Sequence, residues 1–365
     1  MIDFDLQGQL PPPQKRGADW SLEDRCSIAS HLYNGIYYAI TMALIREVGH
    51  ERTYDIHAKL LRHHQKHFFL GGLKKLRLDE EASDAARCAK YHCMSNAVGG
   101  LRTGYSIESA NKAWLFYFPH LPENGWGGQA QIAHSRGNMM SDYLGWHGNN
   151  GTLLGNPGLR YVATHFICDG DPFDGGYFED TGRVLSPDEL VFQRLGEMPP
   201  AASKIQKLSL DSTKWPTERK AKALRNYAVT WAADRISSVL NEGEAALDTA
   251  VRRGIQHTLV TWMPRFKVAL GTAASRDVTS EEFGAYIAAF HSIAGVETEV
   301  KTENRGTAVY VGKALSEFVG GSQTSEEHAR FGKLLGEAWD AIALHAGLAV
   351  AVEDTGRTWT IQPRN

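Results

Sequence analysis

Apolar and polar positions along the chain alternate with the period of helices over most of the first hundred residues. The helical period is clear from Leu22 to Val48 and again from about Thr53 to Phe69. An acidic start at Ser83-Asp84 predicts a third helix that runs to Val98 and ends at two glycines. The aromatic run 113–118, bounded by Pro119, predicts a strand.

The middle of the chain has a different composition. Residues 123–151 are rich in Gly, Asn and His, and we expect one helix there, from Gln131 to Tyr143. Tyr161 to Cys168 is β-like, and a partner strand is expected to begin near Tyr177. Residues 181–220 contain four prolines and little periodicity, which is typical of a connection between domains.

The second half repeats the element order of the first. The pattern predicts helices at 226–240, 245–262, 281–294 and 326–346, and strands at 307–311, 348–352 and 358–362. Arg62 and Gln65 align with Arg253 and Gln256. We therefore predict an α+β fold, a helix-rich tandem duplication of a module in which several helices pack on a small antiparallel sheet. The predicted boundaries are an active module at 1–195, a linker at 196–222 and a degenerate structural repeat at 223–365.

Composition excludes several classes of protein. The 365 residues carry 39 Lys and Arg against 42 Asp and Glu, and 42% are apolar, which excludes wholesale disorder. This near-neutral balance argues against nucleic-acid binding, which needs clustered cations. The longest apolar stretch, from Leu32 to Ile45, falls short of the ~20 residues that span a bilayer, so no membrane partner is expected.

The four cysteines and the N-terminus predict where the protein works. Cys26, Cys88, Cys93 and Cys168 have neither zinc-site nor disulfide-framework spacing, which indicates reduced thiols and a cytoplasmic protein. The start of the chain lacks the basic and apolar regions of a secretory signal. A small-molecule substrate is the expected partner, and a homo-oligomer is left open.

Histidine is the unusual residue, because 11 of the 15 lie between His31 and His165. On the second helix, His57, His64 and His67 fall within a ~80° arc. His63 and His67 have the i, i+4 spacing with which two imidazoles reach one divalent metal. The same positions could instead form a substrate-facing cluster of a histidine-rich pocket, or a solvated face among interleaved Lys and Arg. The aligned positions of the second copy hold Gly, Ile and Thr, so we expect the chemistry in the first module.

Cys93 is a candidate nucleophile, since a thiolate attacks carbon readily when a nearby base lowers its pKa. His92 is adjacent to it, but neighbouring helical residues point ~100° apart, so a base from another element, such as His165, is more credible. The alternative is that Cys93 packs as a small apolar residue.

Two further segments carry candidate chemistry. Asp169, Asp171 and Asp174 follow a strand within a glycine-bearing turn, where converging carboxylates act as a general base, hold a cation or simply form the turn. The glycine-rich segment before them has the character of a functional lid and supplies Trp126, Arg136, Asn138, Asp142, Trp146 and His147. The chain has no dinucleotide fingerprint, Walker motif or GxSxG elbow, so no nucleotide cofactor is expected.

The first half resembles a known layout. Gly104-Tyr105, the strand at Trp114, a helix, Asn156-Pro157-Gly158-Leu159 and a strand closing in Gly170-Asp171-Pro172-Phe173 follow in order. Residues 22–180 in this way resemble the L-2-amino-thiazoline-4-carboxylic acid hydrolase-like family and the 4-vinyl-reductase-type domains of TRAPP-like ligand-binding fold. The family has Cys where this chain has Asp174, and a second Cys in the region of Trp146-His147. The resemblance implies a buried pocket and hydrolysis of a cyclic amidine-like C–N bond.

Together these features predict a small-molecule enzyme, a hydrolase that acts on an amidine- or amide-like C–N bond with a His or Asp general base and Cys93 as a further candidate. The alternatives are a lyase or hydrolase dependent on a His-ligated divalent metal, and a non-catalytic module that binds a small molecule or lipid. The catalytic candidates are His64, His67, His92, Cys93, Asp142, His147, His165, Asp169 and Asp171. The substrate-binding candidates are Asn96, Trp126, Arg136, Asn138 and Trp146, and the metal candidates are His63 and His67.

Overall fold

The computed structural model describes residues 16–119, 135–207, 210–272, 278–303, 306–321 and 323–364. Contacts within the chain group these residues into two compact units. Unit 1 is formed by the described part of His50–Lys220, and unit 2 by the described parts of Gly8–Gly49 and Ala221–Asn365. The boundaries predicted from the sequence differ from this division, because they place residues 8–49 in the first module and a linker at 196–222.

Helix α1 (Leu22–Leu76) runs from one unit into the other. Its two halves meet at Gly49, whose φ of 82° and ψ of 172° interrupt the helical backbone. A residue with a Cβ is strained at this positive φ, whereas glycine adopts it readily. The break explains why the sequence predicts two helices here, and it falls where the units divide.

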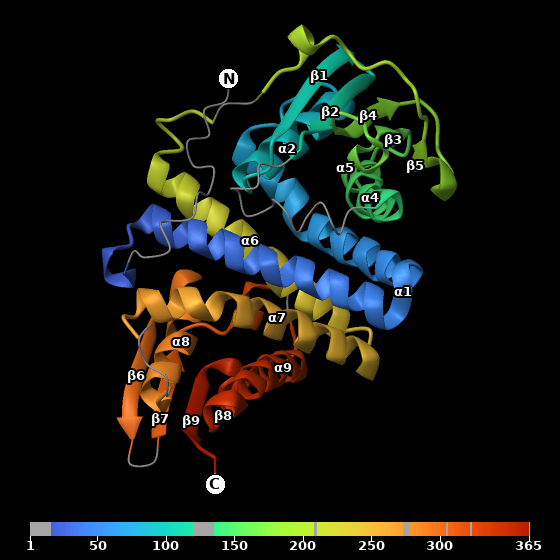
Figure 1. The fold of residues 1–365 in the computed structure, drawn as a ribbon. Coiled ribbons are helices and arrows are strands. Elements are labelled where there is room, and N and C mark those ends of the chain that lie inside the picture. The colour runs from blue at the N-terminus through green and yellow to red at the C-terminus, as the bar shows by residue number, and fades with distance from the viewer. Residues whose placement is uncertain are drawn as a thin grey trace. The chain divides into compact units, whose positions relative to one another are not determined.

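Unit 1 has a five-stranded sheet (Figure 1). The strands are β1 (Thr103–Ser109), β2 (Lys112–Tyr117), β3 (Leu159–His165), β4 (Asp174–Asp180) and β5 (Val191–Gln193), in the order β1-β2-β4-β3-β5. All neighbours are antiparallel except β3 and β5. Helix α2 (Asp84–Val98) precedes the sheet, and Ser83 caps it by accepting from the Ala86 N–H. Helix α4 (Arg136–Asp142), a π-helical segment (Tyr143–His147) and α5 (Asn150–Leu154) connect β2 to β3.

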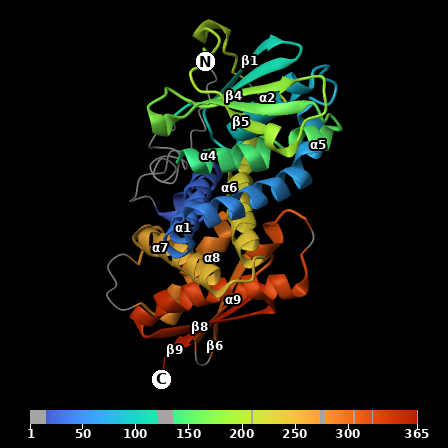
Figure 2. The same cartoon turned by 90° about the vertical axis from the view of Figure 1, so that its right-hand side faces the viewer.

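Unit 2 repeats this order. Helices α6 (Thr217–Leu240), α7 (Ala245–Ala269) and α8 (Ser280–Ile293) lead to the hairpin of β6 (Thr298–Glu303) and β7 (Gly306–Val311). Helix α9 (Ser325–Ala343) then lies against the hairpin of β8 (Leu348–Glu353) and β9 (Thr358–Pro363), as Figure 2 shows. Short 3-10 turns occur at Gly17–Asp19, Ile167–Asp169, Pro187–Glu189, Ala202–Lys204, Leu315–Phe318, Leu344–Ala346 and Asp354–Gly356.

The two sheets have the same topology. The order β6-β7-β9-β8 of unit 2 matches β1-β2-β4-β3 of unit 1, and each sheet has a helix preceding its first hairpin and a helical connection inside it. The α+β fold expected from the sequence is therefore confirmed, and the shared strand order is what a tandem duplication produces. None of the helices in the described ranges combines the length and apolar character needed to cross a bilayer.

Several elements differ from the sequence expectation. The first strand of each hairpin, β1 and β6, was not predicted, and the segment between 181 and 220 contributes β5 to the sheet of unit 1. The predicted strand 161–168 ends earlier, at His165, because the chain turns into the 3-10 helix at Ile167. The helix expected at 131–143 is described only from Arg136, and it continues as the π-helical segment.

Candidate functional site

The second half of α1 directs one face into unit 1. Residues spaced four apart, His57, Leu61, Gln65 and Phe69, are all at most 3% exposed, which is the stripe that a helix buries against a core. His63 and His67 lie on the exposed side and contact each other, with ring centroids 4.4 Å apart. The structure thus brings His57 and Gln65 into the interior. The predicted His64, which is adjacent to Gln65, is only partly buried, and its ring centroid lies 4.5 Å from that of Phe68.

Buried amides connect α1 to α2. Gln65 Nε2 donates to Asn150 Oδ1 over 2.5 Å, and Asn150 Nδ2 lies 2.8 Å from His92 Nε2. All three side chains are 0% exposed. The three residues come from α1, α2 and α5, so this chain of hydrogen bonds ties together elements that are far apart in sequence.

A second set of hydrogen bonds holds His147. The Tyr117 hydroxyl lies 3.3 Å from His147 Nε2 and accepts from Asn96 Nδ2 over 3.2 Å. Asn96 Nδ2 also donates to the His92 carbonyl over 2.7 Å. Asn96, His92 and His147 were candidates from the sequence, and the structure brings all three together, whereas their partner Tyr117 was not predicted.

His92 and His147, here called the histidine pair, lie in an aromatic cage. Their ring centroids are 4.3 Å apart, and His147 stacks on Tyr161 at 4.4 Å. Trp146, another predicted residue, contacts the His92 ring at 5.3 Å. Burial lowers the pKa of His92 to about 3 and that of His147 well below its usual value, so both imidazoles are neutral at physiological pH.

The π-helical segment explains why both Tyr143 and His147 point inward. They occupy its first and last positions, their rings contact each other at 5.2 Å, and both side chains are about 1% exposed. Gly145 lies between them against α1, where an added Cβ would come 2.5 Å from the Ala58 carbonyl oxygen. Wider π turns recur at functional sites, and sequence periodicity does not reveal them.

Asp174 is the most perturbed acid of unit 1. It is 4% exposed, and burial raises its pKa to about 7. A hydrogen bond of 2.8 Å from the Ile167 N–H opposes this rise, whereas the neighbouring charges of Asp142, Asp171 and Asp169 add to it. Asp142, Asp169, Asp171 and Asp174 are called the carboxylate cluster below.

Each other member of this cluster has a partner. Asp142 forms an ion pair with His57, which is 3% exposed. Asp171 accepts from the Phe166 N–H over 2.8 Å and so shapes the turn after β3. Asp169 accepts two hydrogen bonds from Arg136, of 2.9 and 2.6 Å, at the surface. Asp169 and Arg136 therefore fit a surface ion pair, and Asp142 fits a reactive site better.

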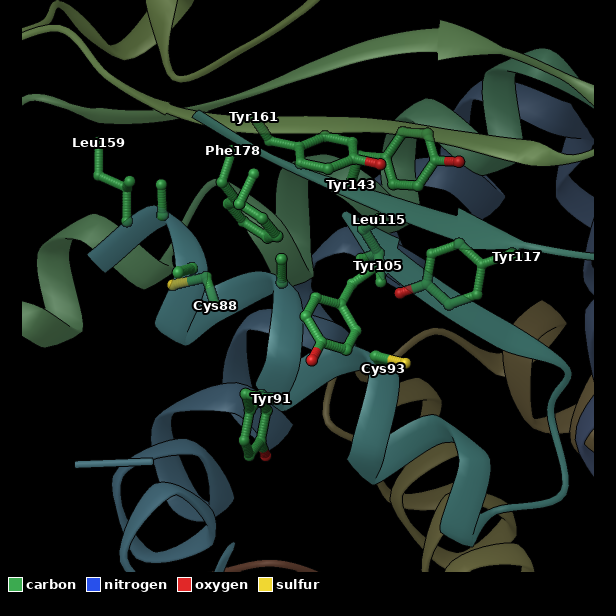
Figure 3. Packing of buried hydrophobic residues seen from close by; sticks show 14 of the residues in the cluster. Cys88, Tyr91, Cys93, Tyr105, Leu115, Tyr117, Tyr143, Leu159, Tyr161 and Phe178 are labelled. Atoms are coloured by element: carbon green, nitrogen blue, oxygen red, sulfur yellow. The ribbon is translucent and has the colours of Figure 1, made fainter. Parts of the chain in front are cut away.

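Tyr143 and Tyr161 connect the carboxylate cluster to the histidine pair. Their rings lie 4.8 Å apart, and Figure 3 shows them side by side above the helix that carries Cys88 and Cys93. Burial raises the pKa of both hydroxyls, and the charge of Asp174 raises it further. Tyr161 also stacks on His147. The interior of unit 1 therefore holds a continuous series of titratable groups from Asp174 to His92.

The predicted nucleophile Cys93 lies within the core. It is 0% exposed, and the Thr103 hydroxyl donates to its carbonyl over 2.8 Å and lies 3.5 Å from its sulfur. Cys88 is equally buried, and burial raises the pKa of its thiol. Cys168 alone of the four cysteines is exposed. These surroundings fit Cys93 as a packed apolar residue.

The remaining candidates are dispersed. His165 is partly buried. Its ring centroid lies 4.5 Å from that of Phe173, and its Nδ1 lies 2.7 Å from the Thr164 hydroxyl. Asn138 is buried at the start of α4, where its N–H bonds to Ser135. Trp126 lies outside the described residues. Within the described ranges, no group of three or more His, Cys, Asp or Glu side chains is arranged to hold a metal ion.

His57 and Gln65 were not predicted as site residues, and neither were Asn150, Tyr161 and Asp174, although His57 belongs to the histidine cluster and Asp174 to the acidic turn that the sequence singles out. The spacing 57, 61, 65, 69 does contain the signal for the first two, because one apolar stripe includes them. Asp174 stands in the acidic turn, but its raised pKa arises mainly from burial, which the spacing of residues does not reveal. Comparison of the chain with protein-family models, with curated proteins and with solved structures finds no significant match.

Proposed function

We propose that unit 1 hydrolyses a C–N bond of a small amide- or amidine-like molecule, with Asp174 and the Asp142–His57 pair as the groups that transfer protons. The observation that carries this proposal is Asp174, a buried carboxyl group whose pKa is raised to about 7. General acids and bases work best when their pKa lies near the working pH. Perturbed carboxyl groups also cluster at functional sites.

The chemistry assigns two roles. Hydrolysis requires removal of a proton from water as its oxygen bonds to carbon, and delivery of a proton to the departing nitrogen. His57, whose Nε2 contacts a carboxylate oxygen of Asp142, has in its neutral form the arrangement of a base oriented by a carboxylate. Asp174, protonated below pH 7, is the corresponding acid. Because Asp142 raises the pKa of Asp174, the two groups are close enough to sense each other.

A second candidate function is binding without catalysis. It is favoured by the complete burial of the histidine pair, whose low pKa makes both imidazoles weak bases. Neutral imidazoles serve as hydrogen-bonding groups for a ligand more readily than as proton acceptors. The metal-dependent alternative gains no support from the described residues.

The test is release of ammonia or amine from a panel of small amides, lactams and cyclic amidines by the full-length protein. We expect turnover of at least one class, with kcat/KM falling as pH rises above about 7 because Asp174 loses its proton. Asp174→Asn should reduce kcat/KM by about 100-fold or more. Asp188→Asn, at an exposed position, is the matched control and should leave turnover unchanged.

Two results would refute the hydrolase. One is full activity in Asp174→Asn protein that is folded by circular dichroism. The other is binding of panel members, measured by calorimetry, without turnover of any of them, which would instead establish the binding module.

A further inference from the structure

Of the buried polar atoms around the histidine pair that have no hydrogen-bond partner among the described residues, three belong to imidazole or amide groups. They are Nδ1 of His92, Nδ1 of His147 and Oε1 of Gln65. Their side chains are at most 1% exposed. An unpaired buried donor or acceptor costs about 1–3 kcal/mol, so three in one cluster indicate a place built for a bound group.

We infer from the hydrogen bonds which nitrogen of His147 carries the proton. Asn96 Nδ2 donates to the His92 carbonyl, which can only accept, so the orientation of this amide is determined. The same nitrogen donates to the Tyr117 hydroxyl, and we assign the hydroxyl hydrogen to His147 Nε2. An imidazole whose Nε2 accepts carries its proton on Nδ1. His147 Nδ1 is therefore an N–H donor.

His92 has the same tautomer. Gln65 Nε2 donates to Asn150 Oδ1, which leaves Asn150 Nδ2 to donate to His92 Nε2. The proton of His92 is then on Nδ1, and Gln65 Oε1 is an acceptor. The two rings, with centroids 4.3 Å apart, carry two unpaired N–H donors, and Gln65, which is linked to His92 through Asn150, adds an unpaired carbonyl acceptor.

From this geometry we propose that His92, His147 and Gln65 form a binding subsite for a neutral amide group, as in a carboxamide or lactam. The amide oxygen accepts from the two imidazole N–H groups, and the amide N–H donates to Gln65 Oε1. His92, His147, Gln65 and Asn150 make hydrogen bonds and ring contacts with other described residues. The partners in all of these contacts are uncharged side chains.

The uncharged surroundings exclude ions as the ligand. A buried carboxylate or ammonium requires an opposite charge, because desolvation of an isolated ion is very costly. The depressed pKa of both imidazoles prevents them from supplying a positive charge. The subsite concerns binding alone, so it can hold whether or not unit 1 hydrolyses a C–N bond.

Long-range ¹⁵N NMR of the full-length protein with ¹⁵N-labelled histidine tests this proposal. We expect two histidines in the Nδ1–H form, whose signals shift saturably with acetamide. Sodium acetate should leave them unchanged, and N,N-dimethylacetamide, which lacks an N–H, should bind more weakly than acetamide. Because no turnover is measured, a failure here is distinct from a failure of the hydrolase proposal.

A pair of single-atom variants serves as test and control. Tyr117→Phe removes the hydroxyl that fixes the His147 tautomer and should weaken acetamide binding about fivefold. Tyr33→Phe removes a buried hydroxyl in unit 2, where it donates to the Phe290 carbonyl, and should leave binding unchanged. Equal response to acetate, an Nε2–H form of His147, or no response to acetamide would each overturn the subsite.

Discussion

A buried carboxyl group with a pKa near neutrality affects stability as well as chemistry. Because Asp174 holds its proton to about pH 7 in the folded protein but ionises near pH 4 when unfolded, unfolding releases a proton between these values. The folded state therefore binds more protons, and the contribution of Asp174 to the free energy of unfolding falls as pH rises from about 4 to about 7.

Asp174→Asn is expected to remove this dependence. An Asn oxygen still accepts from the Ile167 N–H but does not ionise. The variant should gain about 4 kcal/mol in unfolding free energy relative to wild type between pH 4 and pH 8. Urea denaturation at several pH values measures the difference, with Asp188→Asn as the control that should run parallel to wild type. A constant difference between Asp174→Asn and wild type would contradict the raised pKa.

The reactivity of the cysteines distinguishes a structural role of Cys93 from a chemical one. Cys26, Cys88 and Cys93 are 0% exposed, whereas Cys168 is exposed. We expect a colourimetric thiol reagent to modify one cysteine of the native protein and four after denaturation. Cys168→Ala should abolish the native reaction, and Cys93→Ala should not alter it. Rapid native labelling that Cys93→Ala removes would restore Cys93 as a nucleophile.

At the scale of elements, the contact between the π-helical segment and α1 positions His147. A Cβ on Gly145 would come 2.5 Å from the Ala58 carbonyl oxygen and 2.7 Å from Leu61 Cβ. Overpacking of this kind typically costs 1–3 kcal/mol, because neighbouring backbone must move. Since His147 lies two residues further on, the same displacement disturbs the histidine pair.

Gly145→Ala is therefore expected to lower the free energy of unfolding by about 2–3 kcal/mol and to shift the imidazole NMR signals of the histidine pair. Gly71→Ala, on helix α1, is the control, because a Cβ at Gly71 meets no atom within 4 Å. It should stabilise the protein by up to ~1 kcal/mol, the helix propensity of alanine over glycine. Equal changes in the free energy of unfolding for the two substitutions would show that the backbone around Gly145 moves to accommodate the added Cβ.

Sequence periodicity predicted most helices but only part of the site. The stripe of α1 and the caps of α2 are local signals, so the start of α1 and both ends of α2 could be predicted closely. The predicted end at Phe69 falls short of Leu76, and the predicted start at Asn226 lies well after Thr217, where α6 begins. The π turn at Tyr143–His147 and the first strand of each hairpin depend on tertiary packing. For the same reason His92 and His147 could be listed as candidates, whereas their shared cage and their partners Gln65, Asn150 and Tyr117 could not.

At the scale of the whole molecule, the chain order and the compact units do not coincide. The apolar stripe of α1 from Ile28 to Leu44 is buried within unit 2. There the Tyr33 hydroxyl donates to the Phe290 carbonyl over 2.9 Å, and Gly254 packs directly on Ile40. Hydrophobic spacing shows that such a stripe is buried but does not show which residues it packs against. The boundary predicted at residue 195 therefore could not show that the first half of α1 belongs to unit 2.

The division of the chain into two compact units predicts which fragments fold. Residues 50–220 retain the whole sheet of unit 1, including the paired backbones of Tyr105 and Gln206 and the bond from Lys112 to Glu197. A fragment 1–195 loses those two partners and exposes the apolar stripe of residues 28–44, a patch large enough to drive aggregation. We expect the first to be monodisperse with one cooperative thermal transition, and the second to aggregate or to melt at least about 10 °C lower.

Size-exclusion chromatography and differential scanning calorimetry of the two fragments distinguish these outcomes. A third fragment, 50–195, separates the effect of the exposed apolar stripe from the effect of the lost partners. It lacks the partners at 197 and 206, but it does not contain the apolar stripe of residues 28–44. If the stripe dominates, 50–195 remains monodisperse while 1–195 aggregates; if the partners dominate, both fail together. Equal melting temperatures for 1–195 and 50–220 would mean that residues 16–49 pack adequately within the first half, against the grouping of α1 with unit 2.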